Sequence, residues 1–291
     1  MRTAFRGMGV AVITPFNSNG GVDFAALQRI LEHLISNGTD YLVIQGTTGE
    51  QVTLTESEKR AVLDFAIEIN NKRLPLVYGV GGNNTQEILE TLQEFNFDGV
   101  DAILSVSPYY NKPTQEGIFR HYKAIDAVTP RPIILYNVPG RTGRNMQAET
   151  TLRIARECKN MIGIKEASGD LIQCLEIKAS TSDDFLLISG DDLLTPAMIS
   201  MGAVGAISVL ANAYPAVFGQ MVRLALEGQF TKSHELAQKM LPLNRLMYQE
   251  GNPTGVKALL QALGLSAPYV RAPMAEASAE LKNNISKNLI K

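Results

Sequence analysis

A lysine lies within an apolar segment that has the length of a buried strand. Residues 161–167 have the sequence Met-Ile-Gly-Ile-Lys-Glu-Ala, with polar stretches on both sides. Such a short run is typical of a strand in a parallel sheet that is covered on both faces. Because side chains alternate along a strand, Lys165 shares one face with Gly163 and Ala167, which leave room for a ligand. The opposite face is expected to carry the larger side chains, Ile162, Ile164 and Glu166.

Two interpretations fit Lys165. The lysine can end an ordinary strand and reach water along its own stem. Alternatively, dry surroundings keep the amine uncharged for part of the time, so that it can attack a ketone and form a Schiff base. The other polar residues at the strand ends decide between these interpretations.

A glycine-rich loop with two hydroxyls follows another expected strand. Residues 46–50 have the sequence Gly-Thr-Thr-Gly-Glu. The backbone N–H groups and the hydroxyls of Thr47 and Thr48 can hold a carboxylate, as an anion nest does. The alternative is a turn that only reverses the chain.

Tyrosines and an arginine follow two further strands. Tyr109 and Tyr110 lie in a proline-bounded loop, where they act as interface anchors, as a phenol proton relay, or only as packing groups. Tyr136 shares a strand face with Ile134, so we expect it to point inward beside the lysine. Arg141 follows on the same loop, and its planar guanidinium suits a substrate carboxylate or, alternatively, a surface salt bridge.

The remaining strand ends argue against several kinds of site. Barrel enzymes often bind a substrate phosphate with the last two loops, but here residues 190–192 and 208–212 are acidic or neutral. A phosphorylated substrate is therefore disfavoured, and Asp191 and Asp192 are expected to cap the next helix. Residues 79–84, Gly-Val-Gly-Gly-Asn-Asn, depart from the dinucleotide fingerprint at the last position. We expect no metal and no cofactor, because no metal-ligand spacing links the histidines, His33, His121 and His234.

Strands and helices alternate regularly enough to position these loops at one end of a barrel. The expected strands are 9–15, 41–45, 75–80, 100–106, 132–138, 161–167, 185–190 and 204–209. Their starts lie roughly 28 residues apart, close to the spacing in a (β/α)8 barrel of the α/β class. Such even units favour this TIM barrel over an open doubly wound sheet. Helix N-caps are expected at Asp23, Thr55 and Asn84, the last two with capping-box spacing.

The strand signal ends after an eighth helix near 214–226. Three helical stretches follow, at about 229–250, 253–264 and 276–289. The sequence therefore predicts a catalytic barrel, 1–226, and a C-terminal three-helix domain, 227–291, that serves packing and assembly.

Composition excludes other classes of function. The 291 residues are 45% hydrophobic and carry a formal net charge of -2, which favours neither nucleic-acid binding nor binding to an anionic membrane. The N-terminal residues lack the apolar segment of a signal peptide, and no apolar run approaches roughly 18 residues. We expect a cytoplasmic protein whose two cysteines, Cys158 and Cys174, are buried or idle thiols.

Four segments taken together resemble the dihydrodipicolinate synthase family. They are residues 46–50, 108–113, 136–142 and 164–168. The first and the last alone mark only the wider pyruvate-lyase superfamily. Arg141, in Gly-Arg-Thr after Asn-Val-Pro, is similar to the synthases, whereas N-acetylneuraminate lyases differ there.

The resemblance implies a lyase that condenses pyruvate with L-aspartate semialdehyde in the diaminopimelate pathway of lysine biosynthesis. It implies that Lys165 forms the Schiff base with pyruvate. It also implies a proton relay of Thr47, Thr48 and Tyr136, completed by Tyr110 from a neighbouring subunit.

The resemblance assigns further residues to substrate binding and assembly. Thr48 would also hold the pyruvate carboxylate, and Arg141 would hold that of the semialdehyde. Gly190 and Ile207 would line the pyruvate pocket. Members of the family form homotetramers built from tight dimers, so we expect a homo-oligomer. Allosteric positions are matched by three residues, Asn83, Glu87 and Tyr109.

Regulation and two other functions stay open. Lysine-inhibited members have small residues just after the Gly-Thr-Thr-Gly-Glu loop and histidines beyond, whereas this chain has Gln51, Val52, Glu56 and Lys59, so lysine inhibition is not implied. A sister enzyme, such as N-acetylneuraminate lyase or a 2-keto-3-deoxy sugar acid aldolase, would cleave its substrate to pyruvate. A barrel that binds a ligand without catalysis is the third interpretation.

Overall fold

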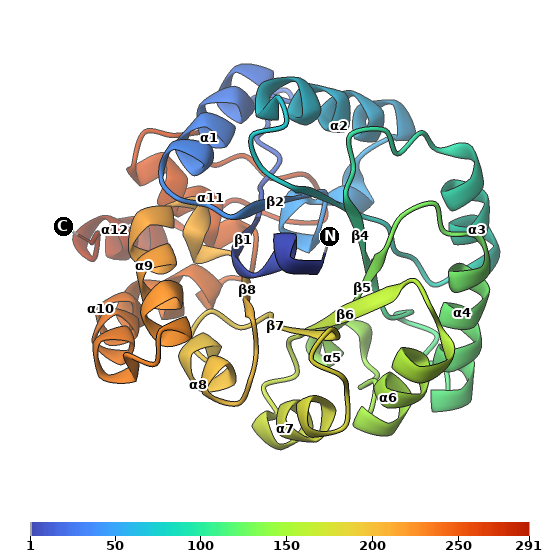
Figure 1. Ribbon diagram of the computed structural model, residues 1–291. Helices are drawn as coiled ribbons and strands as arrows, with labels where there is room; N and C mark the ends of the chain where they lie inside the picture. Colours follow the sequence, from blue (N-terminus) through green and yellow to red (C-terminus); the bar gives the residue numbers. More distant parts are fainter. Residues whose placement is uncertain (1, 291) are drawn as a thin grey trace.

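Parallel strands form a closed barrel with helices around it (Figure 1). The computed structural model describes residues 2–290. Within this range the strands follow one another around the barrel as β1 (Gly7–Ala11), β2 (Tyr41–Ile44), β3 (Leu76–Gly79), β4 (Ala102–Val106), β5 (Ile133–Asn137), β6 (Met161–Glu166), β7 (Leu186–Ser189) and β8 (Gly205–Ser208). The (β/α)8 barrel expected from the sequence is confirmed.

Helices connect the strands and continue after the last one. Those of the barrel are α1 (Phe24–Ser36), α2 (Glu56–Asn70), α3 (Thr85–Glu94), α4 (Gln115–Val128), α5 (Pro139–Thr142), α6 (Ala148–Glu157), α7 (Leu171–Ala179), α8 (Thr195–Ser200) and α9 (Pro215–Leu226). Short 3₁₀ turns are η1 (Arg2–Phe5), η2 (Thr47–Gly49), η3 (Gln51–Thr53) and η4 (Leu210–Asn212). Within residues 2–290, no helix combines the length and apolarity that a membrane span requires.

Side-chain caps begin the helices at the expected places. Asp23, Thr55 and Asn84 each accept a bond from a backbone N–H in the first turn. Thr55 forms the reciprocal capping box with Glu58. The box expected at Asn84 is wrong, because Glu87 binds the side-chain amide of Asn84 rather than its backbone.

The expected bounds of the first strand, 9–15, are wrong at both ends. Gly7 begins β1 with a φ of +91° and pairs with Gly205 of β8. This contact between two glycines closes the barrel, and apolar patterning does not reveal it. The apolar residues at the other end stay buried, but the chain leaves the ladder after Ala11, where the side chain of Asn212 binds the Ala11 oxygen and the Ile13 N–H.

Two groups of apolar side chains form the core. The larger group fills the space between the strands and the surrounding helices. The smaller group fills the barrel interior and includes Val43, Val77, Ile134, Tyr136, Ile188 and Ile207. The interior is therefore a packed core and not an open channel.

The expected outward position of Ile162 is wrong. Ile162 packs with the interior group, because the register of β5 and β6 shifts between Ile133 and Ile134 and skips one residue of β6. Such an irregularity changes which face the flanking side chains occupy. Lys165 lies beyond the shift and points inward, as expected.

In the C-terminal segment, α10 packs beside α8 and α9, and α11 and α12 pack against α10 (Figure 1). The helices of this segment are α10 (Phe230–Gln249), α11 (Thr254–Ala262) and α12 (Ala279–Lys287), close to the expected ranges. No further strand follows among residues 227–290. The division into a barrel, 1–226, and a helical domain, 227–291, stays a prediction, which we propose on this basis.

Candidate active site

Lys165 lies near the carboxyl end of β6, with its side chain inside the barrel. The residue is only 5% exposed. Tyr136 of β5 is its neighbour across the strands, and Nζ of Lys165 lies 4.5 Å from the centroid of the Tyr136 ring. A Cβ added at Gly190, after β7, would lie only 3.1 Å from Cε of Lys165 and 2.6 Å from Cβ of Ala167. The lysine is therefore held between an aromatic ring and a glycine that leaves space for it.

A cavity of about 480 Å³ includes Lys165 in its wall. The other lining residues expected from the sequence are Thr48, Tyr136, Arg141 and Gly190. The cavity therefore brings the expected amine together with the hydroxyls of Thr48 and Tyr136 and the guanidinium of Arg141 at the carboxyl ends of the strands.

A second cavity of about 220 Å³ is lined by Thr47 and Tyr109. Tyr136, Val138 and Arg141 line both cavities. Tyr136 therefore stands between the space beside Thr47 and the space beside the lysine.

Asn252, in the loop between α10 and α11, connects Thr48 with Arg141. Its Nδ2 donates to Oγ1 of Thr48 at 3.0 Å, and Nη2 of Arg141 donates to its backbone oxygen at 3.2 Å. Because Oγ1 of Thr48 accepts this bond, its O–H is left to donate to a ligand. No pattern in the sequence pointed to Asn252 as a site residue.

A polar network lies behind Tyr136 and Lys165, on the other face of their strands. Asn137 and Glu166 are paired in register, and Nδ2 of Asn137 donates to both Glu166 oxygens, at 3.1 and 3.0 Å. The amide of Gln173 donates to the same carboxyl at 2.9 Å. Burial raises the pKa of Glu166, and these hydrogen bonds oppose that rise. The network fixes the two strand ends from which the tyrosine and the lysine project.

The two acidic residues after β7 have different partners. The expectation that Asp191 caps α8 is wrong, because its carboxyl accepts the N–H groups of Leu193 and Leu194 in the preceding turn and the helix has no side-chain cap. The expectation that Asp192 caps the same helix is wrong. Its carboxyl accepts the N–H groups of Val209 and Leu210, which follow β8, and burial raises its pKa to about 6. These N–H groups are therefore occupied by the protein's own carboxyl.

Two expected site residues, Tyr110 and Ile207, do not line either cavity. Tyr110 is 86% exposed, has a φ of +70° and is not among the residues that line either cavity. Ile207 is buried in the interior apolar group and is likewise not a lining residue.

The three expected allosteric residues do not line one common cavity in the described chain. Glu87 lines a polar cavity of about 560 Å³ together with Lys59. Tyr109 lines the cavity of Thr47, and the backbone oxygen of Asn83 accepts a bond from Asn111.

Sequence reasoning also missed the contribution of α10. Four of its side chains line the cavity of Lys165: Asn244, Arg245, Tyr248 and Gln249. They form two pairs four residues apart and so share one helix face. That polar stripe was a signal in the sequence, but nothing in it indicated contact with the barrel.

Among residues 2–290, no group of three or more His, Cys, Asp or Glu side chains is arranged to hold a metal ion.

Comparisons with known proteins agree over nearly the whole chain. The Dihydrodipicolinate synthetase family matches residues 4–291. A 4-hydroxy-tetrahydrodipicolinate synthase from Cytophaga hutchinsonii is 50% identical over 287 residues, which cover 99% of this chain and 96% of that protein.

Solved structures agree with the sequence comparison. The dihydrodipicolinate synthase from Thermotoga maritima matches with a TM-score of 0.95 and 37% identity over 98% of this chain and 97% of that one. The chloride-inhibited dihydrodipicolinate synthase from Acinetobacter baumannii, crystallised with pyruvate, matches with a TM-score of 0.94 and 37% identity over 97% of each chain. The chain therefore belongs to the dihydrodipicolinate synthetase family.

Proposed function

We propose that this protein is a lyase that condenses pyruvate with L-aspartate semialdehyde to 4-hydroxy-tetrahydrodipicolinate, in the diaminopimelate pathway to lysine. The observation that carries the proposal is the buried amine of Lys165, 4.5 Å from the Tyr136 ring centroid, in a cavity that also holds Thr48 and Arg141. Membership of the family supports the same activity, and a relative from Acinetobacter baumannii has been crystallised with pyruvate.

Lys165 is the proposed nucleophile. Its amine attacks the keto carbon of pyruvate, and loss of water gives an imine. The protonated imine withdraws electrons, so the methyl carbon loses a proton and becomes an enamine that attacks the aldehyde carbon of the second substrate. The amino group of that substrate then closes the ring and displaces the lysine.

Hydroxyl groups are proposed to move the protons of these steps. Tyr136 lies between the cavity of Lys165 and that of Thr47, which supports a relay from one to the other. Tyr110, exposed within one chain, is proposed to complete the relay in the cavity of a neighbouring subunit.

Two groups are proposed to hold the two substrate carboxylates. The hydroxyl of Thr48 and the backbone of its loop bind that of pyruvate, and the guanidinium of Arg141 binds that of the semialdehyde. Gly190 leaves the space that pyruvate needs beside the lysine, and Ile207 is proposed to close the floor of the pocket.

We further propose a cytoplasmic homotetramer built as a dimer of dimers. Asn83, Glu87 and Tyr109 remain candidate residues for an allosteric site. Activity assays with and without lysine test that site, and the molecular mass in solution tests the assembly.

Borohydride reduction in the presence of pyruvate tests the central assignment. The reduced adduct is expected on the peptide that contains Lys165, and Lys165→Met should abolish it. Lys159→Met, which removes an exposed lysine just before the same strand, is the matched control and should leave the adduct unchanged. An adduct on another lysine would contradict the mechanism.

Turnover with candidate substrates separates the synthase from its sister enzymes. Condensation with L-aspartate semialdehyde is expected. Release of pyruvate from N-acetylneuraminate, undiminished in Arg141→Ala, would identify a sialic acid lyase instead. Pyruvate binding with no turnover of either kind would identify a non-catalytic barrel.

A further inference from the structure

Glu50 is a buried carboxylate directly beside the loop of Thr47 and Thr48. It ends the η2 turn in the left-handed conformation, with φ 52° and ψ 35°. Its side chain is only 3% exposed, and the residue is not among those that line the cavities of Thr47 and Lys165. Glu50 is therefore placed to hold the turn and not to contact a substrate.

The partners of Glu50 come from the far end of the chain. Nζ of Lys257, on α11, donates to Oε1 of Glu50 at 2.5 Å, and the backbone N–H of Arg271 donates to Oε2 at 3.0 Å. A buried carboxylate needs such partners, because it has lost its hydration. The position of the η2 turn thus depends on residues of the C-terminal segment.

The side chain of Lys257 is held in place by contacts within the protein. Its side chain has no exposed surface, and its Nζ also donates to the backbone oxygen of Tyr269 at 2.8 Å. The ammonium lies 4.0 Å from the centroid of the Phe16 ring. These contacts fix the ammonium in one position, so the carboxylate that it binds is fixed as well.

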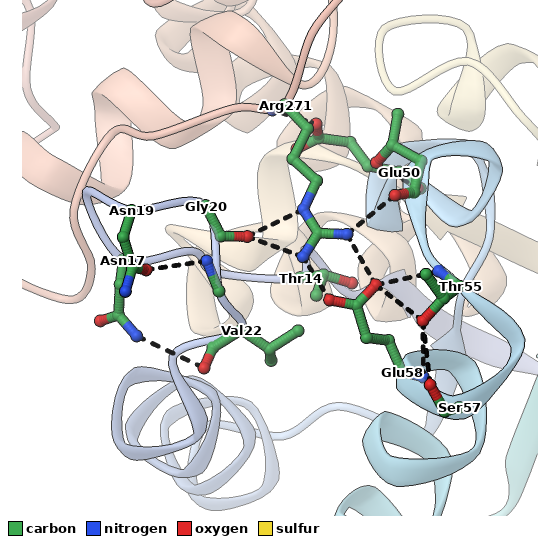
Figure 2. Close-up of polar contacts among 12 residues, drawn as sticks. Thr14, Asn17, Asn19, Gly20, Val22, Glu50, Thr55, Ser57, Glu58 and Arg271 are labelled. Carbon is green, nitrogen blue, oxygen red and sulfur yellow. Dashed lines mark hydrogen bonds and ion pairs between the residues drawn. The ribbon is translucent and has the colours of Figure 1, made fainter.

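Arg271 holds the chain that follows Glu50. Figure 2 shows its guanidinium between Gly20 and Glu58. It donates to the Gly20 oxygen at 2.9 and 2.7 Å, to the Thr53 oxygen at 2.8 Å, and to the Glu58 carboxylate at 2.8 and 2.5 Å. The segment from Glu50 to Glu58 is therefore bound to the C-terminal segment at both ends.

We propose that Lys257 is a positioning residue for catalysis, which holds the Thr47 and Thr48 turn in its active form through the buried carboxylate of Glu50. The inference rests on the proposed function, because it assigns the turn to the proton relay and to pyruvate binding. Its consequence is that the C-terminal segment controls turnover although Lys257 does not touch the substrate.

Two variants separate positioning from folding. Lys257→Met leaves the Glu50 carboxylate buried without its cation, so both stability and activity should fall. The double variant Glu50→Gln with Lys257→Met removes both charges and should recover most of the stability. Because the double variant still lacks the connection from α11 to the turn, its kcat should stay at least about fivefold below that of the unmodified protein, with a raised KM for pyruvate.

Leu260→Ala is the matched control on the same helix. Leu260 is fully buried in the apolar core and has no part in the ion pair. Its truncation should lower the unfolding temperature while kcat and KM stay within about twofold at a temperature where the protein is folded. A purely structural role for Lys257 would give the same result as this control.

Reductive trapping distinguishes failure of this inference from failure of the proposed function. At saturating pyruvate the folded variants should still form the adduct on Lys165, because that amine is unchanged. A folded double variant with kcat and KM within twofold of the unmodified protein would overturn the positioning role. Absence of adduct and turnover in the unmodified protein would instead overturn the proposed function.

Discussion

The space around Lys165 depends on a missing side chain. Gly190 has no Cβ. A Cβ added at this position would lie 3.1 Å from Cε of Lys165. A reacting amine that is displaced by a fraction of an ångström loses its alignment with the ketone. The glycine is therefore as important to the geometry as the lysine itself.

Gly190→Ala is expected to lower kcat/KM for pyruvate by on the order of 100-fold, because the added methyl displaces the amine. Steady-state kinetics and the rate of borohydride trapping measure the effect. Gly82→Ala is the control, since its Cβ would meet Ile88 at an ordinary 3.7 Å. Equal rates in the two variants would contradict the spatial role of Gly190.

Tyr110→Phe is expected to lower turnover by about 100-fold while the KM for pyruvate changes little. The reason is that a lost phenol acts on proton transfer and not on pyruvate binding. Initial-rate kinetics with both substrates measure the two constants separately. Unchanged turnover would mean that Tyr110 only packs.

Residues at strand ends could be predicted because strand alternation fixes their direction. Lys165 and Tyr136 point inward as that alternation requires. Asn252 could not be predicted, because its contacts with Thr48 and Arg141 cross a large separation in sequence. Local patterns carry no information about such pairs.

At the scale of elements, apolar periodicity located the strands and the cap residues located the helix starts. Apolar periodicity predicted the wrong strand bounds where backbone geometry, and not hydrophobicity, decides where a strand begins. The positive φ of Gly7 starts β1 early, and the register shift beside Ile134 turns Ile162 inward. Both features depend on a neighbouring strand that the local sequence does not specify.

Acid should weaken the contact between α2 and the C-terminal segment. The hydrogen bonds from Arg271 lower the pKa of Glu58 from 4.5 to about 2. A carboxyl whose pKa is lower in the folded state stabilises the fold above its unfolded pKa, and this stabilisation is lost as the pH falls. The stabilisation is lost as the pH falls from about 4.5 to about 2.

Glu58→Gln is expected to lower the free energy of unfolding by about 1–2 kcal/mol at neutral pH. The difference from the unmodified protein should shrink as the pH falls through that interval. Urea unfolding at a series of pH values measures it. Glu68→Gln, on the exposed part of the same helix, should show no comparable pH-dependent difference.

At the scale of the whole molecule, the barrel closes where β1 meets β8. Gly7 and Gly205 pair there, and a Cβ on Gly205 would lie 1.9 Å from the Gly7 oxygen. Even spacing of the units predicted closure, but it could not identify the glycines that permit it. The contacts of α10 and α11 with the site could not be predicted either, because the periodicity of an amphipathic helix shows which face is apolar but not which element packs against it.

Gly205→Ala is expected to destabilise the protein by on the order of 2–3 kcal/mol, because the methyl separates the closing strands. The thermal unfolding midpoint measures the loss. Gly228→Ala is the control: Gly205 has a φ of +149° and Gly228 one of +76°, but no atom lies within 4 Å of the Cβ added at Gly228. An equally large fall of the unfolding midpoint in the control would mean that backbone strain alone causes the effect.

During synthesis on the ribosome, β1 and Glu50 emerge long before the residues that they contact. β1 cannot pair with β8 until residue 208 has emerged, and Glu50 waits still longer for Lys257 and Arg271. Through most of translation the nascent chain therefore carries an open sheet edge and an unmatched carboxylate. Chains that stall before residue 208 keep the exposed edge, which makes them targets for chaperones, and chains that stall before residue 257 lack the partner that holds Glu50.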